Sequence, residues 1–284
     1  MTTPISSGTA IAGQRQASRS RLLDRYYLRT QFNKHALTIL AIGIFIFLYM
    51  PILILIVYSF NENRVVGVWS GFSTQWYRAL YQDEAVIDAL MVSLWVAVWS
   101  TLISTILGTL VALALERHRF RGRLALDAGL YLPVIIPDIV MALSTLLFFV
   151  LFSVALSRYT ILIAHVAFNI SFVAIVVRAR LADMDANLEE AAADLGADEW
   201  HTFRRVTLPL LMPGIVAGAL LAFTLSLDDF VITFFVSGPG STTLPVRVYS
   251  MIKFGVTPEV NAVSTLMFVG STLLVVISLL LQRR

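Results

Sequence analysis

Six long apolar runs constrain this chain more than any other feature of its sequence. A helix needs about 20 apolar residues to cross the hydrocarbon core of a bilayer, and each run reaches or approaches that length. The runs cover roughly residues 36–60, 89–114, 127–152, 160–177, 211–236 and 261–281. Only 14% of the residues are charged, whereas soluble domains carry about a quarter. The sequence therefore predicts an all-α integral membrane protein with six transmembrane helices.

The distribution of Lys and Arg predicts the orientation of these helices. Sixteen of the 21 lie before the first run, in the loops after the second and fourth runs, and at the C-terminus. Cytoplasmic segments are enriched in these residues, so we expect both termini in the cytoplasm. Residues 1–35 are then a cytoplasmic N-terminal tail, residues 36–284 form one transmembrane domain, and residues 182–210 form the longest inner loop.

Several kinds of chemistry are excluded or disfavoured by what the sequence lacks. The chain has no cysteine, which rules out disulfides, thiolate metal sites and cysteine nucleophiles. It has no GxxxxGK[ST] phosphate-binding loop, so it cannot bind ATP by that route. His118, His165 and His201 have no partners at metal-ligand spacing, so we expect no metal site. His165, alone in the fourth run, is interpreted as a packed polar residue.

The inner loop carries signals for two short helices. Asn187 and Glu190 resemble a capping box, and Gly196 can end the first helix in a left-handed conformation. Asp198 can cap a second helix that carries Trp200. This loop could be a docking surface for another protein or an amphipathic segment on the lipid surface, and the pattern leaves both open.

Three acids lie deep in the apolar runs. Asp138 follows Pro137 in the third run, and Asp228 and Asp229 precede Phe230 in the fifth. A charged side chain at the bilayer centre costs about 2.5–3.5 kcal/mol on insertion scales. The acids could line a pathway for a cation, or they could belong to a structural network. The second reading includes polar partners such as Asn169 and Ser171, or a helix break at the Asp pair.

The inner loop also resembles a known family. Its motif residues follow a fixed spacing over 20 positions: Glu190, Ala191, Ala192, Gly196, Val206, Leu208 and Pro209. This spacing is similar to the EAA signature of permease subunits in binding-protein-dependent ABC importers. The resemblance implies the type I importer permease fold, with Glu190, Ala191, Ala192, Gly196, Leu208 and Pro209 in a coupling loop that docks on an ATPase subunit. It also implies a second permease, an ATPase dimer that holds ATP and Mg, a periplasmic solute-binding protein, and a bacterial inner-membrane location. No cofactor and no catalysis are expected in this chain itself.

Two further segments narrow the resemblance. YLPVIIPDIVMALS and SLDDFVITFFVSGPGSTTLPVRVYSMIKFGVTPEVNAVSTL are similar to the second permease of spermidine/putrescine transporters. The resemblance implies half of a polyamine pathway, with Asp228, Asp229, Asp138 and Phe230 as its substrate-facing residues. Other solutes stay open as alternatives, namely ferric iron, an amino-acid derivative or an opine, as does a transporter that uses no ATP. A membrane aspartyl protease is disfavoured, because Pro137 and Leu227 stand where that family requires other neighbours.

Overall fold

The computed structural model describes residues 36–65, 67–185 and 187–282, with side chains 278, 279, 281 and 282 left out. Within these ranges the chain is helical apart from loops and one isolated bridge between Asn61 and Phe72, which confirms the all-α prediction. Five described helices are long and apolar enough to cross a membrane, and a bent helix pair makes six if it counts as one span. The predicted tail, residues 1–35, and Arg283 and Arg284 lie outside the described residues.

The chain divides into two compact units, residues 1–57 and 58–284. The first unit contributes the helix Ala36–Tyr58, and none of the residues in its most apolar stretch is buried. Large side chains such as Phe47, which is 76% exposed, cover all its sides. A helix that is apolar all round is suited to lipid or to a protein partner.

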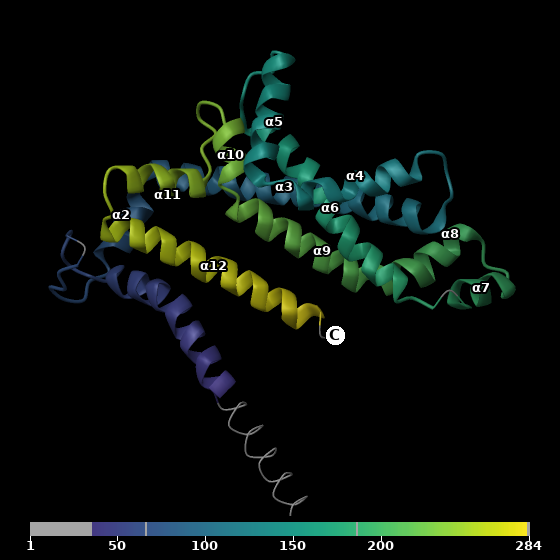
Figure 1. The fold of residues 1–284 in the computed structure, drawn as a ribbon, viewed down its shortest axis with the longest axis horizontal. Helices are drawn as coiled ribbons and strands as arrows, with labels where there is room; N and C mark the ends of the chain where they lie inside the picture. Colours follow the sequence, from purple (N-terminus) through teal and green to yellow (C-terminus); the bar gives the residue numbers. More distant parts are fainter. Residues whose placement is uncertain (1–35, 66, 186, 283–284) are drawn as a thin grey trace, which may run out of the picture. The chain divides into compact units, whose positions relative to one another are not determined.

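Three helices form the centre of the second unit. They are α3 (Glu84–Arg117), α6 (Arg158–Ala182) and α9 (Leu208–Asp228), which lie side by side along their lengths (Figure 1). Their contacts depend on small residues that allow close approach. A Cβ atom on Gly214 would lie 2.7 Å from the Cβ of Arg180, and one on Gly218 would lie 3.3 Å from Val173. The sequence GxxxG at 214–218 is thus a packing surface for α6.

A second group of helices packs around one end of this centre. α12 (Pro258–Gln282) lies along α9 and α2 (Gln75–Gln82), and α11 (Leu244–Lys253) contacts both α3 and α12. Leu80 and Ala262 belong to the buried cluster that joins them. The contacts with α2 and α11 hold α12 against α9 near the C-terminal end of α9.

The third apolar run forms two helices rather than the single transmembrane helix that the sequence predicts. α4 (Arg123–Ile135) and α5 (Asp138–Leu151) meet at an angle of 114°. Pro133 stays inside α4, and the break falls at Ile136 and Pro137. A proline disfavours the helical conformation of the residue before it, and Ile136 accordingly has extended backbone with ψ of 135°.

The fifth run also breaks. α9 ends at Asp228, Asp229 is extended, and α10 (Val231–Val236) follows after Phe230. The structure thus contains the helix break at the Asp pair that the sequence left open. α5 and α10 pack against each other and stand together in Figure 1. The two breaks therefore occur next to each other in space.

Candidate functional site

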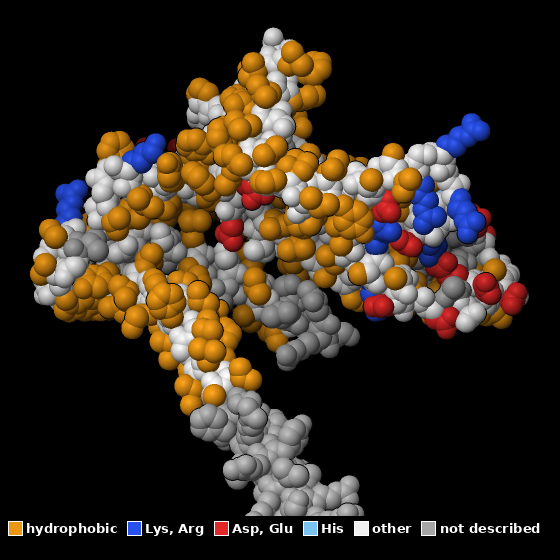
Figure 2. All heavy atoms as spheres, in the orientation of Figure 1, with side chains coloured by type: hydrophobic (Ala, Val, Ile, Leu, Met, Phe, Trp, Pro, Cys, Tyr) orange, Lys and Arg blue, Asp and Glu red, His pale blue; other side chains and the backbone are white. Residues whose placement is uncertain are grey.

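A cavity of 340 Å³ lies where the two broken spans meet. Its lining includes all four residues that the sequence analysis proposed for the substrate pathway, namely Asp138, Asp228, Asp229 and Phe230. Figure 2 shows acidic side chains among hydrophobic ones in the middle of the face that it presents. Folding thus brings acids about 90 residues apart in the sequence to one cavity.

Helix ends give the three acids different electrostatic surroundings. Asp138 is the first residue of α5, and Asp229 lies two residues before the first residue of α10. The N-terminus of a helix carries a positive partial charge that stabilises an anion. Asp228 is the last residue of α9, where the partial charge is negative. Two of the acids therefore occupy favourable helix ends, and Asp228 occupies an unfavourable one.

The carboxylate of Asp229 accepts hydrogen bonds from residues of α10. Its Oδ2 accepts hydrogen bonds from the backbone N–H of Thr233 at 2.8 Å and from the Thr233 hydroxyl at 2.8 Å. Its Oδ1 accepts a longer bond from the N–H of Ile232 at 3.4 Å. The carboxylate thus caps α10 and stabilises the break that precedes this helix.

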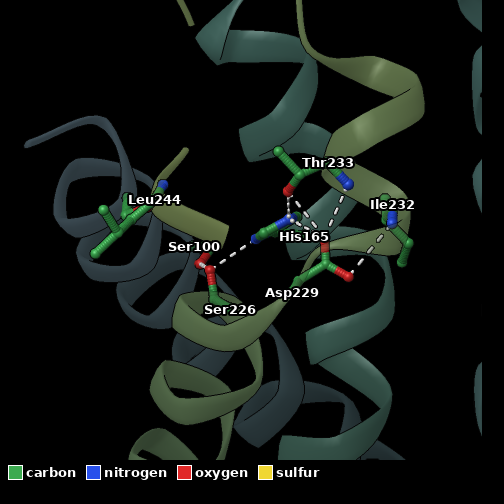
Figure 3. Close-up of polar contacts among 8 residues, drawn as sticks. Ser100, His165, Ser226, Asp229, Ile232, Thr233 and Leu244 are labelled. Atoms are coloured by element: carbon green, nitrogen blue, oxygen red, sulfur yellow. Dashed lines mark hydrogen bonds and ion pairs between the residues drawn. The ribbon is translucent and has the colours of Figure 1, made fainter. Parts of the chain in front are cut away.

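His165 connects this cap to the helical centre (Figure 3). Its Nδ1 lies 2.7 Å from the Ser226 hydroxyl, and its Nε2 lies 3.2 Å from Asp229 Oδ2 and 3.0 Å from Thr233 Oγ1. The Ser100 hydroxyl donates to Ser226 at 2.9 Å, which leaves the Ser226 proton for Nδ1. If the His165 ring carries its proton on Nε2, each group in this chain donates one hydrogen bond to the next. The hydrogen bonds then lead from Ser100 on α3 through Ser226 and His165 to the carboxylate of Asp229.

The polar partners of the acids differ from those that the sequence suggested. The side chain of Asn169 is fully buried, and neither of its amide atoms has a hydrogen-bond partner in the described part of the chain. His165 and Thr233 bond Asp229 in its place. The reading of His165 as a packed polar residue is confirmed, since its side chain has no exposed surface. The sequence gives a partial signal for its pairing with Asp229, because His165 lies near the start of the fourth run and Asp229 near the end of the fifth.

Asp228 faces away from this network. The Ser271 hydroxyl on α12 donates to its two carboxylate oxygens at 3.0 and 3.2 Å. Within the described ranges no Lys or Arg forms an ion pair with Asp228. Besides the 340 Å³ cavity, Asp228 borders a mostly apolar cavity of 610 Å³ that α2, α3, α9 and α12 surround. Asp228 is thus an exposed carboxylate at the boundary of two cavities.

Phe230 contributes an aromatic wall to the smaller cavity. Its ring centroid lies 5.5 Å from that of Phe234 and 4.7 Å from that of Tyr249 on α11. These contacts fix the orientation of the Phe230 ring. Part of its surface is left to line the cavity.

The inner loop folds into two short helices, as predicted, although Asn187 is the first residue of the first helix rather than its cap. α7 (Asn187–Asp194) ends before Gly196, whose φ of 84° is a conformation that favours glycine. α8 (Glu199–Thr202) is capped by Asp198, which accepts from the N–H of His201 at 2.7 Å. This backbone bond, with the contact to the His201 side chain, lowers the pKa of Asp198 below its usual value.

The motif residues of this loop lie on its surface or at its junction with α9. Glu190 and Ala191 are exposed, and Leu208 and Pro209 are the first two residues of α9. Trp200 is 64% exposed and stacks on Phe203. Charged side chains gather at this end of the second unit in Figure 2. The loop therefore presents the carboxylate of Glu190 and the large aromatic side chain of Trp200 outward.

The comparisons with known proteins agree with this architecture. Residues 104–284 match the family model described as "Binding-protein-dependent transport system inner membrane component". The spermidine/putrescine transport system permease protein PotC of Haemophilus influenzae is 42% identical over 262 residues, which are 92% of this chain and 99% of that protein. The putrescine transport system permease protein PotI of Escherichia coli K12 is 44% identical over 81% of this chain and 84% of its own length.

Solved structures show the same fold at lower sequence identity. A chain of a bacterial ABC transporter involved in the import of alginate superposes with a TM-score of 0.69 at 20% identity, over 95% of this chain and 98% of its own. A chain of the MetNI methionine ABC transporter superposes with a TM-score of 0.59 over 75% of this chain. Because the family model covers more than half of the chain, and because the relatives match nearly all of it, this multi-pass inner-membrane protein belongs to the family of binding-protein-dependent transport system inner membrane components.

Proposed function

We propose that this chain forms half of the pathway of an ATP-driven importer for polyamines such as putrescine and spermidine. The observation that carries the proposal is Asp228, an exposed carboxylate at the C-terminal end of α9. Among the described residues, its bonded side chain is the Ser271 hydroxyl. A negative charge is unfavourable at that end of a helix and costly inside a membrane. A cationic substrate removes both penalties.

The lining of the cavity favours an organic cation. Asp138 and Asp229 line the same cavity as Asp228, and apolar side chains including Met141, Phe168 and Phe172 lie between helices there. Ammonium groups form charge-assisted hydrogen bonds with carboxylates, and methylene spacers are compatible with apolar walls. The names of the PotC and PotI relatives support the same class of substrate.

The alternative solutes fit this cavity less well. Within the described residues no group of three or more His, Cys, Asp or Glu side chains is placed to hold a metal ion, which argues against ferric iron. Amino-acid derivatives and opines carry carboxylates, which an acidic cavity repels. The polyamine assignment therefore has the better chemical support.

The partners of the proposed importer follow from the family and from the exposed loop. An ATPase dimer, with ATP and Mg bound to it, would receive α7 and α8, with Glu190, Ala191, Ala192 and Gly196 at the contact. A periplasmic solute-binding protein would deliver the substrate. A second permease would supply the other half of the pathway. The exposure of Glu190 and Trp200 supports the ATPase contact.

The proposal is tested by uptake of labelled putrescine and spermidine into vesicles that contain the complete complex. Asp228→Asn removes the charge and keeps the size of the side chain. The loss of a charge-assisted bond of about 1.5–3 kcal/mol raises the half-saturating substrate concentration about 10- to 100-fold. Asp88→Asn, at an exposed position of α3, is the matched control. Normal affinity in the Asp228 variant would contradict the proposal.

A further inference from the structure

Three side chains join the inner loop to the end of α3. Arg117 is the last residue of α3, Glu189 lies in the first turn of α7, and Thr207 ends the π-helical turn η1 (Phe203–Thr207). Nη2 of Arg117 donates to Oε1 of Glu189, and the Thr207 hydroxyl donates to the same oxygen at 2.5 Å. Arg117 also reaches Thr207 Oγ1 at 3.5 Å. We refer to Arg117, Glu189 and Thr207 as the joint.

The joint is partly shielded from water. Thr207 has no exposed surface, and the side chains of Arg117 and Glu189 are 32% and 27% exposed. Ion pairs that water reaches freely contribute little, whereas hydrogen-bonded and partly buried pairs hold their geometry better. The helix ends reinforce the pair, because Arg117 lies at a C-terminus and Glu189 near an N-terminus.

The π-helical turn orients the buried hydroxyl. The N–H of Leu208 bonds to the carbonyl of Phe203, five residues earlier, instead of to the residue four earlier. Such a turn contains one extra residue and shifts the side chains that follow by about 100° relative to those before it. Thr207 therefore points into the loop while Leu208 and Pro209 begin α9 in the orientation that its packing needs.

Two neighbouring acids of α7 differ in their surroundings. Glu190, which belongs to the EAA signature, is exposed, whereas Glu189 turns inward to Arg117 and Thr207. Successive residues of a helix point about 100° apart, so one acid can face a partner protein while the other holds the loop. The signature draws attention to Glu190, but the internal contact belongs to Glu189.

We infer that the joint is a second mechanical connection, through which a displacement of α7 reaches α3 as well as α9. The inference rests on the proposed function. α6 and α9 are linked to the loop through the backbone, whereas α3 is linked to it by Arg117 and Glu189. At the same end, Arg178 of α6 bonds Glu116 of α3 at 2.8 Å and Asp127 of α4 at 2.5 Å. A displacement of α3 therefore also displaces α6 and α4. The far end of α4 is the break between α4 and α5, which lies beside the cavity.

Without the joint, the loop and the π-helical turn would absorb part of the displacement. ATP hydrolysis would then continue while transport falls. This separation of the two activities is what distinguishes a transmission role from a merely structural one. A structural defect would lower the amount of assembled complex and would reduce both activities together.

The test compares ATP hydrolysis and polyamine uptake in vesicles that contain the complete complex. For Glu189→Gln and Thr207→Val we expect the rate of ATP hydrolysis to stay within about twofold of that of the unmodified complex and the rate of uptake to fall about tenfold. A tenfold fall is the effect of losing one charge-assisted contact while the loop is displaced. The double exchange Arg117→Glu with Glu189→Arg restores the ion pair in reverse and should recover uptake to within about threefold. Arg119→Gln, which removes an exposed charge from the loop after α3, is the control and should change neither activity.

Two results would overturn the inference. One is an unchanged ratio of uptake to hydrolysis in Glu189→Gln. The other is loss of ATPase binding in that variant without recovery in the exchange variant, which would make Glu189 a direct contact of the ATPase. A failure of the proposed function would look different, because the unmodified complex itself would then take up no polyamine.

Discussion

Replacing His165 by Ala tests the polar network that connects the helical centre to the break after α9. His165 is fully buried and contacts Ser226, Asp229 and Thr233. The substitution removes these contacts and the packing of the imidazole ring against Phe168, 5.4 Å away between centroids. We expect a clear loss of stability without a general collapse of the fold.

The size of the loss follows from what each partner retains. Hydrogen bonds between membrane helices average about 0.6 kcal/mol, so three contacts amount to about 2 kcal/mol. No partner is orphaned, because Ser226 keeps its bond from Ser100, and Asp229 keeps its bonds from Thr233. The larger penalty of about 3–5 kcal/mol for a buried charge left alone therefore does not apply. The predicted loss is about 2–3 kcal/mol once the lost packing is added.

Because the natural chain has no cysteine, the opening of its core can be followed with one introduced thiol. Ala222→Cys places that thiol at a fully buried position of α9, and a maleimide labels it only when the core opens. A loss of about 2 kcal/mol corresponds to labelling that is about 30-fold faster. His118→Ala changes an exposed histidine and is the control. Labelling of the His165 variant within about threefold of that control would refute the reasoning.

Two other substitutions probe backbone features of the fold. A Cβ on Gly238 would lie 1.8 Å from the carbonyl oxygen of Leu156, so Gly238→Ala should lower the yield of folded protein in detergent extracts. A Cβ on Gly129, in the middle of α4, meets nothing within 4 Å. Gly129→Ala should therefore raise the free energy of unfolding by about 0.5–1 kcal/mol. The lowered pKa of Asp198 means that its cap on α8 is present at neutral pH and is lost as the pH falls through that pKa. The amide NMR shift of His201 should follow this titration, and Asp198→Asn, which keeps a cap without a titrating charge, should abolish it.

Local signals in the sequence predicted the inner loop well. Gly196 and Asp198 act through their own backbone and their nearest neighbours, so their roles need no knowledge of the tertiary structure. The close packing of Gly214 and Gly218 on α6 also has a local signal, because GxxxG spacing is typical of packing surfaces between membrane helices. These features appear in the structure where the sequence places them.

The helix breaks and the His165 network were harder to predict. Hydropathy continues unchanged through Pro137 and Asp229, because apolar residues flank both breaks. Non-helical backbone inside a membrane depends on a cavity or on protein neighbours, and those come from other spans. The pairing of His165 with Asp229 likewise depends on which faces of α6 and α9 meet. Periodicity is weak when most of a helix is apolar.

The ends of α4 and α9 beside the cavity have a consequence for how substrate preference can change. The last turn of a helix leaves carbonyl oxygens without partners in the same helix, and these weak acceptors belong to the main chain. No side-chain mutation removes them, so these acceptors stay beside the cavity whatever residues surround the break. Exchange of individual carboxylates can then retune the choice among amines, while the main-chain acceptors at the breaks stay in place.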